Sequence, residues 1–450
     1  MRHGFVEGDV NTSLLRKEWI AALDPFTKAL LKRDETCFFR QSLSTPCFNA
    51  VKSADGIYLS DYSGKRYMDF HGNSVHQVGY GNPAVVDAVI NQLRELSFSP
   101  RRYANEKAIE LAESLIGFMP TSDYKVLFTP SGSISIGLAL KMARRYTGRY
   151  KIVSLWDSFH GAGLDSISVG GEGLFRSGIG PLMPGCEHIM PYNSYRCVFG
   201  KCDACGLKCL DYLEYALNCE GDIGAVLMEP IRCTDVQIPP VEYYRRLRAL
   251  CDKHGVVLMF DEIPTALGRT GKMYGFLNYD IQPDVLVLGK GLGGGLIPMS
   301  AVVARADMDV SPNISLGHYT HEKNPVGSAA ALAVIDFIIQ NGILDHAAEM
   351  GCHLKKRLNE AMHQYECIGD IRVIGLLAGI ELVTSRNNKE KACELAEKIL
   401  YDCLRRGLSF KVSQGNVLTL SPPLTITCEQ LDTAIDIVLT SIGHCLSCAK

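Results

Sequence analysis

Residues 256–271 read VVLMFDEIPTALGRTG, and residues 285–295 read VLVLGKGLGGG. Each segment begins with a short apolar run that has the length of a buried strand. The first run ends in the carboxylates of Asp261 and Glu262, and the second ends in the amine of Lys290. Charged groups are costly to bury without partners. Because ligands bind beyond the carboxyl ends of strands in an open parallel sheet, these side chains are candidates for a binding site.

The sequence around these two strands alternates apolar strands with amphipathic helices. This rhythm is typical of βαβ units and predicts an α/β fold with a mostly parallel sheet in a large domain. The expected strands and helices are 125–129, 134–145, 152–156, 225–229, 241–254, 256–261 and 285–289.

The 450 residues are long for one domain, and we expect a division into a large and a small domain. Residues 1–70, which include a hairpin at 56–70, are the N-terminal part of the small domain. Residues 71–323 form the large domain, and residues 324–450 form the C-terminal small domain. This last region predicts helices and a strand in an α+β arrangement at 327–340, 347–365, 377–382, 390–406 and 430–442.

Composition favours a small-molecule partner. The 46 basic and 49 acidic residues leave a net charge of −3, which provides no electrostatic reason to expect nucleic acid or an anionic membrane. The first residues lack the apolar stretch of a secretory signal, and no apolar run is long enough to span a bilayer. We therefore expect a cytoplasmic protein.

Seventeen cysteines over this length are expected to be mostly reduced thiols. Four of them cluster at Cys197, Cys202, Cys205 and Cys209, which is close enough for zinc or an iron–sulfur cluster. The alternative is a set of reduced or loosely paired thiols, and we expect no metal.

Two further strand ends carry candidate ligand groups. Ser131, Gly132 and Ser133 open the helix at 134–145, where backbone N–H groups and hydroxyls could bind a phosphate, although an ordinary helix cap would look the same. Phe159 and His160 follow the strand at 152–156, and an aromatic ring there could stack on a planar heterocycle or simply pack in the core.

Taken together, these motifs resemble those of class III aminotransferases, which are enzymes of fold type I that depend on pyridoxal 5′-phosphate (PLP). The resemblance covers roughly residues 45–440. Its motifs, in chain order, are Ser131-Gly132-Ser133, Phe159-His160-Gly161, Glu229-Pro230, DEIPTALGRTG at 261–271, Gly289-Lys290-Gly291 and Thr320 ahead of Asn324-Pro325.

The resemblance implies a role for each matching residue. Lys290 would hold PLP as a Schiff base, and Asp261 would pair with the ring nitrogen. Phe159 and Ile263 would cover the two ring faces. Family members are homodimers with active sites at the interface, so Thr320 would reach the phosphate of the partner subunit's cofactor. The remaining cofactor-binding residues would be Ser131, Gly132, Ser133, His160 and Glu229.

The sequence departs from the family pattern where the substrate binds. Many members place an arginine for a substrate carboxylate where this chain has Thr419, and a threonine cannot replace a guanidinium. Pro264 and Arg232 stand where glutamines are common. Asn73, Ser74 and His76 replace apolar residues, which suits a polar or anionic substrate.

Arginines could supply the missing cation. Arg101, Arg102 and Arg232 could bind a phosphonate or phosphate, although surface ion pairs would explain them equally well. The candidate substrate contacts are Asn73, His76, Arg102 and Arg232.

Within the family, this combination is most similar to the ammonia-lyases acting on 1-hydroxy-2-aminoethylphosphonate, with phospho-lyases acting on ethanolamine phosphate as neighbours. The implied reaction converts the (R) substrate to phosphonoacetaldehyde and ammonia. One alternative is an ω-aminotransferase that transfers an amine or amino-acid nitrogen to a keto acid. Another is a catalytically silent PLP-binding regulator, against which the intact Lys290 and Asp261 argue.

Overall fold

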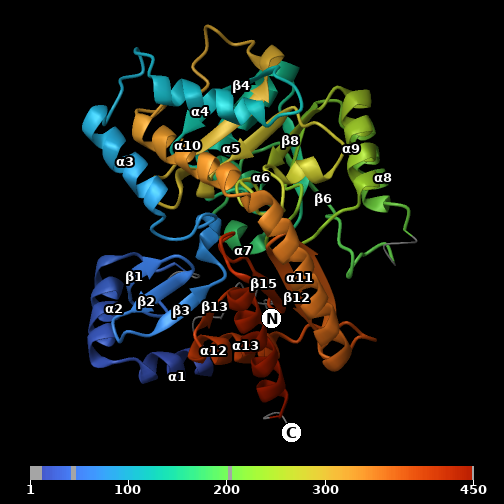
Figure 1. Cartoon of the computed structure of the whole chain (residues 1–450). Coiled ribbons are helices and arrows are strands. Elements are labelled where there is room, and N and C mark those ends of the chain that lie inside the picture. Colours follow the sequence, from blue (N-terminus) through green and yellow to red (C-terminus); the bar gives the residue numbers. More distant parts are fainter. Residues whose placement is uncertain (1–12, 42–46, 201–204, 448–450) are drawn as a thin grey trace. The chain divides into compact units, whose positions relative to one another are not determined.

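The computed structural model describes residues 13–41, 47–200 and 205–447. It divides into two compact units. The small unit takes residues 1–82, 234–236 and 345–450, and the large unit takes residues 83–233 and 237–344. Described segments from the N-terminal and the C-terminal parts of the chain belong to the small unit, and Figure 1 shows the elements along the chain.

The boundaries between the units differ from the expected positions 70 and 323. They fall after Asn82 and Leu344, so that α3 (Pro83–Glu95) and α10 (Pro325–Gln340) both belong to the large unit. Gly294 of the large unit explains this placement, because a Cβ there would lie 2.7 Å from Val85 of α3 and 3.1 Å from Val334 of α10. The two helices therefore pack tightly on the strand connections of the large unit.

The large unit contains a seven-stranded sheet in the order β4-β10-β9-β8-β7-β5-β6. Neighbouring strands from β9 to β6 are parallel, whereas β10 runs antiparallel between β4 and β9. Its strands are β4 (Tyr124–Thr129), β5 (Lys151–Leu155), β6 (Cys186–Ile189), β7 (Ile223–Met228), β8 (Val257–Asp261), β9 (Val285–Leu288) and β10 (Ser300–Arg305). Its other helices are α4 (Glu106–Gly117), α5 (Gly132–Thr147), α6 (Leu164–Val169), α7 (Gly173–Arg176), α8 (Lys208–Cys219) and α9 (Val241–His254), with short 3-10 turns at η3 (Gly275–Asn278), η4 (Lys290–Gly293) and η5 (Ala306–Met308).

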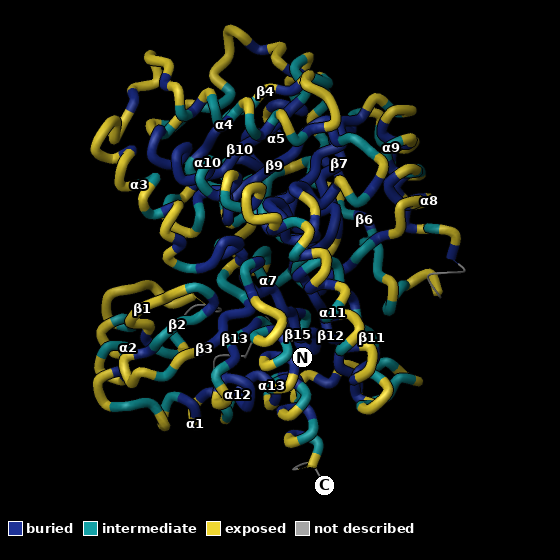
Figure 2. The backbone as a smooth tube through the Cα atoms, viewed as in Figure 1, coloured by how far each residue is buried: buried dark blue, intermediate teal, exposed yellow. Residues whose placement is uncertain are grey.

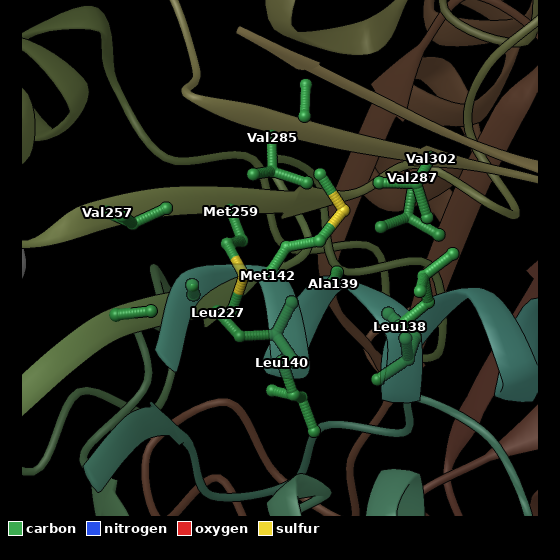
Figure 3. Packing of buried hydrophobic residues seen from close by; sticks show 14 of the residues in the cluster. Leu138, Ala139, Leu140, Met142, Leu227, Val257, Met259, Val285, Val287 and Val302 are labelled. Atoms are coloured by element: carbon green, nitrogen blue, oxygen red, sulfur yellow. The ribbon is translucent and has the colours of Figure 1, made fainter. Parts of the chain in front are cut away.

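The core of the large unit lies between α5 and this sheet. Every residue of β7, β8 and β9 is buried, as expected for strands covered on both faces. Figure 3 shows Leu138, Ala139 and Met142 of α5 against the strand side chains. In Figure 2, the labelled strands β7 and β9 have the dark blue colour of buried residues. The sheet edge that carries the candidate residues is therefore supported by a packed core.

The small unit contains two four-stranded sheets, in the orders β1-β2-β3-β13 and β11-β12-β15-β14. Its strands are β1 (Val51–Asp55), β2 (Tyr58–Asp61), β3 (Arg66–Asp69), β11 (Ile368–Ile374), β12 (Leu377–Leu382), β13 (Leu408–Ser409), β14 (Lys411–Ser413) and β15 (Val417–Leu420). Its helical elements are α1 (Leu14–Ala22), α2 (Pro25–Cys37), η1 (Gly72–Ser74), most of α11 (Ile343–Gln364), α12 (Cys393–Arg405) and α13 (Cys428–Ser447).

Residues 234–236 join the small unit through hydrogen bonds to its second sheet. Buried Arg372 donates to the carbonyl of Asp235 at 2.9 and 3.1 Å and pairs with Glu381 at 2.8 Å. Thr419 donates to the carbonyl of Thr234 at 2.9 Å. Residues 234–236, which follow Glu229 in the chain, are therefore held in place by hydrogen bonds to the carbonyls of Thr234 and Asp235.

No single helix among the described residues has the length and hydropathy of a membrane span. Helices α10 and α11 meet that criterion only when they are counted together across the bend between them.

Candidate active site

Four candidate side chains lie at the carboxyl edge of the large sheet. Asp261 ends β8, and Glu229 and Lys290 follow the neighbouring strands β7 and β9. The pairing of Met228 with Phe260 and of Phe260 with Leu286 brings these three strand ends together. His160 comes from the loop after β5, which pairs with β7. The strand-end rule led to His160, Asp261 and Lys290 in the sequence, whereas Glu229 was a candidate only through the family resemblance.

Asp261 is a buried carboxylate that contacts a backbone N–H group and a histidine ring. It is 2% exposed, accepts the backbone N–H of Ile263 at 3.0 Å and contacts Nδ1 of His160 at 2.8 Å. Among the described residues, neither a lysine nor an arginine forms an ion pair with it. A buried carboxylate of this kind stabilises a cation that enters the site, such as a protonated ring nitrogen.

Glu229 is a second buried carboxyl beside Asp261. Its Oε2 accepts the backbone N–H of Cys233 at 2.9 Å, whereas Oε1 is buried with no hydrogen-bond partner among the described residues. Burial, and then the negative charge of Asp261, raise the pKa of Glu229 to about 7, although His160 and Lys290 act in the opposite direction. Glu229 therefore changes charge near neutral pH next to Asp261.

Replacing Glu229 by glutamine is expected to stabilise the cofactor-free protein at pH 8 by on the order of 3 kcal/mol, since a pKa raised from 4.5 to about 7 favours the neutral form. In the parent protein, the stabilising contribution of the neutral Glu229 carboxyl is fully present below pH 4.5. This contribution is lost as the pH rises through about 7. The gap between variant and parent should therefore widen over this range. Urea unfolding at a series of pH values measures it.

Glu214→Gln is the matched control, because the hydrogen bond from Lys253 lowers the pKa of Glu214 instead of raising it. The unfolding free energy of Glu214→Gln should not rise above that of the parent protein at high pH. A constant difference between Glu229→Gln and the parent from pH 5 to pH 8 would contradict the assignment.

The carboxyl of Glu262, the neighbour of Asp261, stabilises a loop. Its carboxyl accepts the backbone N–H groups of Gly275 and Phe276, which closes the loop after β8. The side chain is fully buried, and burial raises its pKa to about 7. The acidic pair seen in the sequence therefore separates into one carboxyl that faces the site and one that holds a loop.

The turn Ser131–Ser133 forms a cradle at the N-terminus of α5. Ser131 is the cap residue of this 16-residue helix, and its side chain makes no capping hydrogen bond. Ser133 accepts the backbone N–H of Ala162 at 3.0 Å, which joins the cradle to the loop of Phe159 and His160. The first-turn N–H groups and the helix dipole suit a phosphate.

Ile263 lies between the cradle and the lysine segment. A Cβ at Gly132 would lie 2.6 Å from Cδ1 of Ile263, and one at Gly289 would lie 3.3 Å from its Cγ2. Only glycine allows the cradle to approach Ile263 this closely. The prediction that Ile263 packs on a planar ligand stays a prediction, but its position next to Gly132 and Gly289 is compatible with that role.

A buried pair of hydroxyls supports the site and was missed by the sequence reading. Ser135 of α5 donates to Oγ of Ser300 at 2.9 Å, and Ser300 donates to the carbonyl of Leu288, two residues before Lys290. Both serines are fully buried. No sequence signal distinguishes them from other serines, because their contact joins residues 165 positions apart.

Lys290 has an unusual backbone and an accessible side chain. Its φ of 48° lies in the left-handed region, which a non-glycine residue adopts at a cost and which is common at functional sites. The residue is exposed on the described chain. Phe159 is half-buried, with its ring centroid 4.5 Å from that of Phe175. Both side chains are thus available to a ligand.

The other predicted site residues are spread over both units. Arg232 is buried, and its backbone pairs with Gln237 in a tight loop. Arg102 and Thr320 are exposed on the large unit. In the small unit Asn73 is exposed with a φ of 46°, whereas His76 is buried with Nε2 3.1 Å from the carbonyl of Asp69. Their substrate roles stay predictions.

The donor set fits pyridoxal phosphate. The cradle offers N–H groups and hydroxyls for a phosphate, Asp261 offers a buried negative charge, and Lys290 offers an amine. Oε1 of Glu229 and Nε2 of His160 are buried and have no hydrogen-bond partner among the described residues, as is common where a ligand completes a site.

Three of the four clustered cysteines are among the described residues. Cys205 and Cys209 are buried, Cys197 is partly exposed, and Cys202 lies outside the described residues. Burial raises the pKa of Cys209 to about 11, which keeps it a thiol at neutral pH. Cys37, Cys186, Cys251 and Cys367 of the described residues carry free thiols.

Comparison with known sequences supports this geometry. Residues 40–442 match the family model for class-III aminotransferases. The chain is 48% identical to the (R)-1-hydroxy-2-aminoethylphosphonate ammonia-lyase of Vibrio splendidus (strain 12B01), over 97% of this chain and 95% of that protein. It is 37% identical to the leucine/methionine racemase of Thermococcus litoralis, over 86% and 88% of the two chains.

Solved structures with the same fold include aminotransferases. One is the taurine:2-oxoglutarate aminotransferase of Bifidobacterium kashiwanohense in complex with PLP and glutamate, with a TM-score of 0.87 and 30% identity over 94% of this chain and 99% of that chain. Another is a PLP-bound amine transaminase from an uncultivated Pseudomonas species, with a TM-score of 0.85 and 29% identity over 91% and 99%.

Proposed function

The chain belongs to the class-III aminotransferase family, and from that premise we propose that it is a PLP-dependent ammonia-lyase that converts (R)-1-hydroxy-2-aminoethylphosphonate to phosphonoacetaldehyde and ammonia. The observation that carries this proposal is the 48% identity, over nearly the whole of both chains, to an enzyme of that activity. The expected fold type and the expected cofactor, pyridoxal 5′-phosphate, are confirmed by the family match and the similar structures.

In the proposed reaction, each side chain of the site has its own role. When bound, pyridoxal phosphate supplies an electron sink for the electron pair left at the carbon that bears the amine. Asp261 stabilises positive charge at the ring nitrogen, and Ser131–Ser133 bind the phosphate. Phe159 and Ile263 orient the ring. Lys290 holds the cofactor and moves the proton at the carbon bearing the amine.

The proposed reaction is an elimination followed by hydrolysis. A proton leaves the carbon bearing the amine, and the hydroxyl leaves the neighbouring carbon, which bears the phosphonate. The resulting enamine takes up water and separates into phosphonoacetaldehyde and ammonia. No second substrate is needed, so the site requires no means of binding a keto acid.

The residue type at position 419, a threonine, favours the proposal of a substrate that has no carboxylate beside the amine. The residue is buried in β15; its hydroxyl donates to the carbonyl of Thr234 at 2.9 Å and accepts from Oγ of Ser413 at 3.1 Å. Its hydroxyl is thus engaged within the small unit, and it carries no charge. The cation that many family members use for a carboxylate is absent at this position.

We also propose a homodimer in the cytoplasm. Ile90 and Leu93 of α3 and Leu296 near Lys290 are apolar and exposed on the large unit, which supports a second copy covering this region. The free thiols of Cys186, Cys251 and Cys367 support a reducing compartment.

The substrate class is tested by comparing the phosphonate with its carboxylate analogue, isoserine. Both carry the same amine and hydroxyl, and they differ in the anion. We expect kcat/KM to favour the phosphonate by at least roughly 100-fold, because anion recognition by charge-assisted hydrogen bonds depends on geometry. Steady-state release of ammonia measures both rates. Equal or better turnover of isoserine would contradict the proposed substrate.

An ω-aminotransferase is the second candidate. It is favoured by the similarity to the taurine aminotransferase, whose substrate likewise has no carboxylate beside its amine. The two reactions differ in their need for a keto acid.

A further inference from the structure

Two loops of the large unit lie side by side on its surface. They are residues 96–105, between α3 and α4, and residues 315–323, before α10; we call them the paired loops. The rings of Phe98 and His321 are 5.4 Å apart, and Asn105 donates to the carbonyl of Lys323 at 3.0 Å. Arg101 donates to Nε2 of His318. Contacts at three points therefore hold the two loops together.

The paired loops expose positive charge that the described chain does not neutralise. Arg101, Arg102 and Lys323 are exposed, and among the described residues neither arginine forms an ion pair with a carboxylate. Glu322 is the one acid in these two segments; it is partly buried and its charge acts on Tyr319. Other arginines of the large unit are paired: Arg248 and Arg305 both contact Asp284. The two guanidiniums are thus available to an external anion.

Thr320 connects this charge to the active site. The family resemblance places Thr320 at the phosphate of the partner subunit's cofactor, and His318, which holds Arg101, lies two residues before it. Two residues span at most about 7 Å. Within the described chain, neither a hydrogen bond nor an ion pair joins Arg101 or Arg102 to Asp261, His160 or Lys290.

We propose that, in the homodimer, Arg101 and Arg102 bind the anionic group of the substrate in the active site of the partner subunit. This inference rests on the proposed function. A phosphonate presents three oxygens and up to two negative charges, which match the forked donors of guanidinium groups. The contact with His318 orients Arg101, while Arg102 extends freely. Each active site thus takes its lysine from one chain and its anion-binding arginines from the other.

The first experiment separates recognition of the anion from chemistry. The variant Arg101→Ala/Arg102→Ala is compared with Arg245→Ala, which removes an exposed arginine of α9. For the hydroxyaminophosphonate, KM of the double variant should rise roughly 10- to 100-fold with a smaller change in kcat. For ethanolamine, which lacks the phosphonate, its kinetics should match those of Arg245→Ala. Equal losses of kcat/KM on both substrates would overturn the proposal. An unchanged KM for the phosphonate would also overturn it.

The second experiment tests whether the arginines act across the interface. Lys290→Ala and the double arginine variant carry two different tags and are unfolded, mixed in equal amounts and refolded. Activity is measured at a substrate concentration well below the KM of the unmodified enzyme, where each variant alone is weakly active. Half of the dimers should be mixed, and each mixed dimer should contain one complete site, so about a quarter of the activity of the unmodified enzyme should return. Mixed dimers that form but recover no activity would overturn the assignment to the partner subunit.

Failure of the proposed function would look different from failure of this inference. If the function is wrong, the unmodified enzyme releases no ammonia from the phosphonate without a keto acid. If only the inference is wrong, the unmodified enzyme releases ammonia, but the double variant or the mixed dimers behave against expectation.

Discussion

Lys290→Ala is expected to lower kcat by roughly four orders of magnitude, because in the proposed function this side chain both holds the cofactor and moves the proton. The residue follows β9 at the edge where Asp261 and Glu229 end their strands. It is exposed, so removing its side chain leaves the packed core intact. Steady-state ammonia release, together with a thermal unfolding curve, measures both the activity and the fold.

Lys272→Ala is the matched control, since it removes another exposed lysine of the large unit. It should keep its activity within about twofold, as surface substitutions usually do. Methylamine added to Lys290→Ala should restore part of the rate if the missing amine moves a proton. Activity of Lys290→Ala within tenfold of the unmodified enzyme would exclude the assigned role.

Asp261→Asn is expected to reduce kcat/KM by roughly 10²- to 10⁴-fold, as removing one partner of a buried ion pair costs about 3–5 kcal/mol. The amide keeps the shape of the carboxyl and can still accept from the backbone of Ile263. It cannot neutralise positive charge on a ring nitrogen in a site that is 2% exposed. The loss should therefore be electrostatic, and the affinity for the cofactor should fall as well.

Asp284→Asn separates this effect from a general loss of stability. Asp284 is also a buried acid of the large sheet, but it pairs with Arg248 and Arg305 and accepts the backbone N–H of Leu258. Its replacement should lower the unfolding free energy and leave kcat/KM of the folded protein nearly unchanged. A comparable loss of kcat/KM in both variants would show that the effect of Asp261→Asn is not specific to the cofactor.

The sequence predicted those elements whose pattern is local. Helix α9 and strand β12 have the predicted bounds, because regular apolar spacing and glycine or proline signals mark their ends. The placement of Asp261 and Lys290 at one edge of the sheet followed from the rule that parallel strands end at one edge. These inferences depend on neighbours within a few residues or on one general rule of topology.

Other features depend on contacts that no local pattern encodes. Strand β10 was not predicted, and its antiparallel pairing with β4 and β9 joins segments that are far apart in the chain. The unit boundary at Leu344 follows from the packing of α10 near Gly294. Likewise, only the structure shows that Arg232 is buried while Arg101 and Arg102 share a surface with His318.

The most direct test of the proposed lyase activity is an assay without any keto acid. Purified protein and PLP are incubated with racemic 1-hydroxy-2-aminoethylphosphonate, and ammonia and phosphonoacetaldehyde are measured over many turnovers. The expected result is equal amounts of the two products, far in excess of the enzyme. No ammonia in this assay, with turnover only when pyruvate or 2-oxoglutarate is added, would contradict elimination and identify the protein as an aminotransferase.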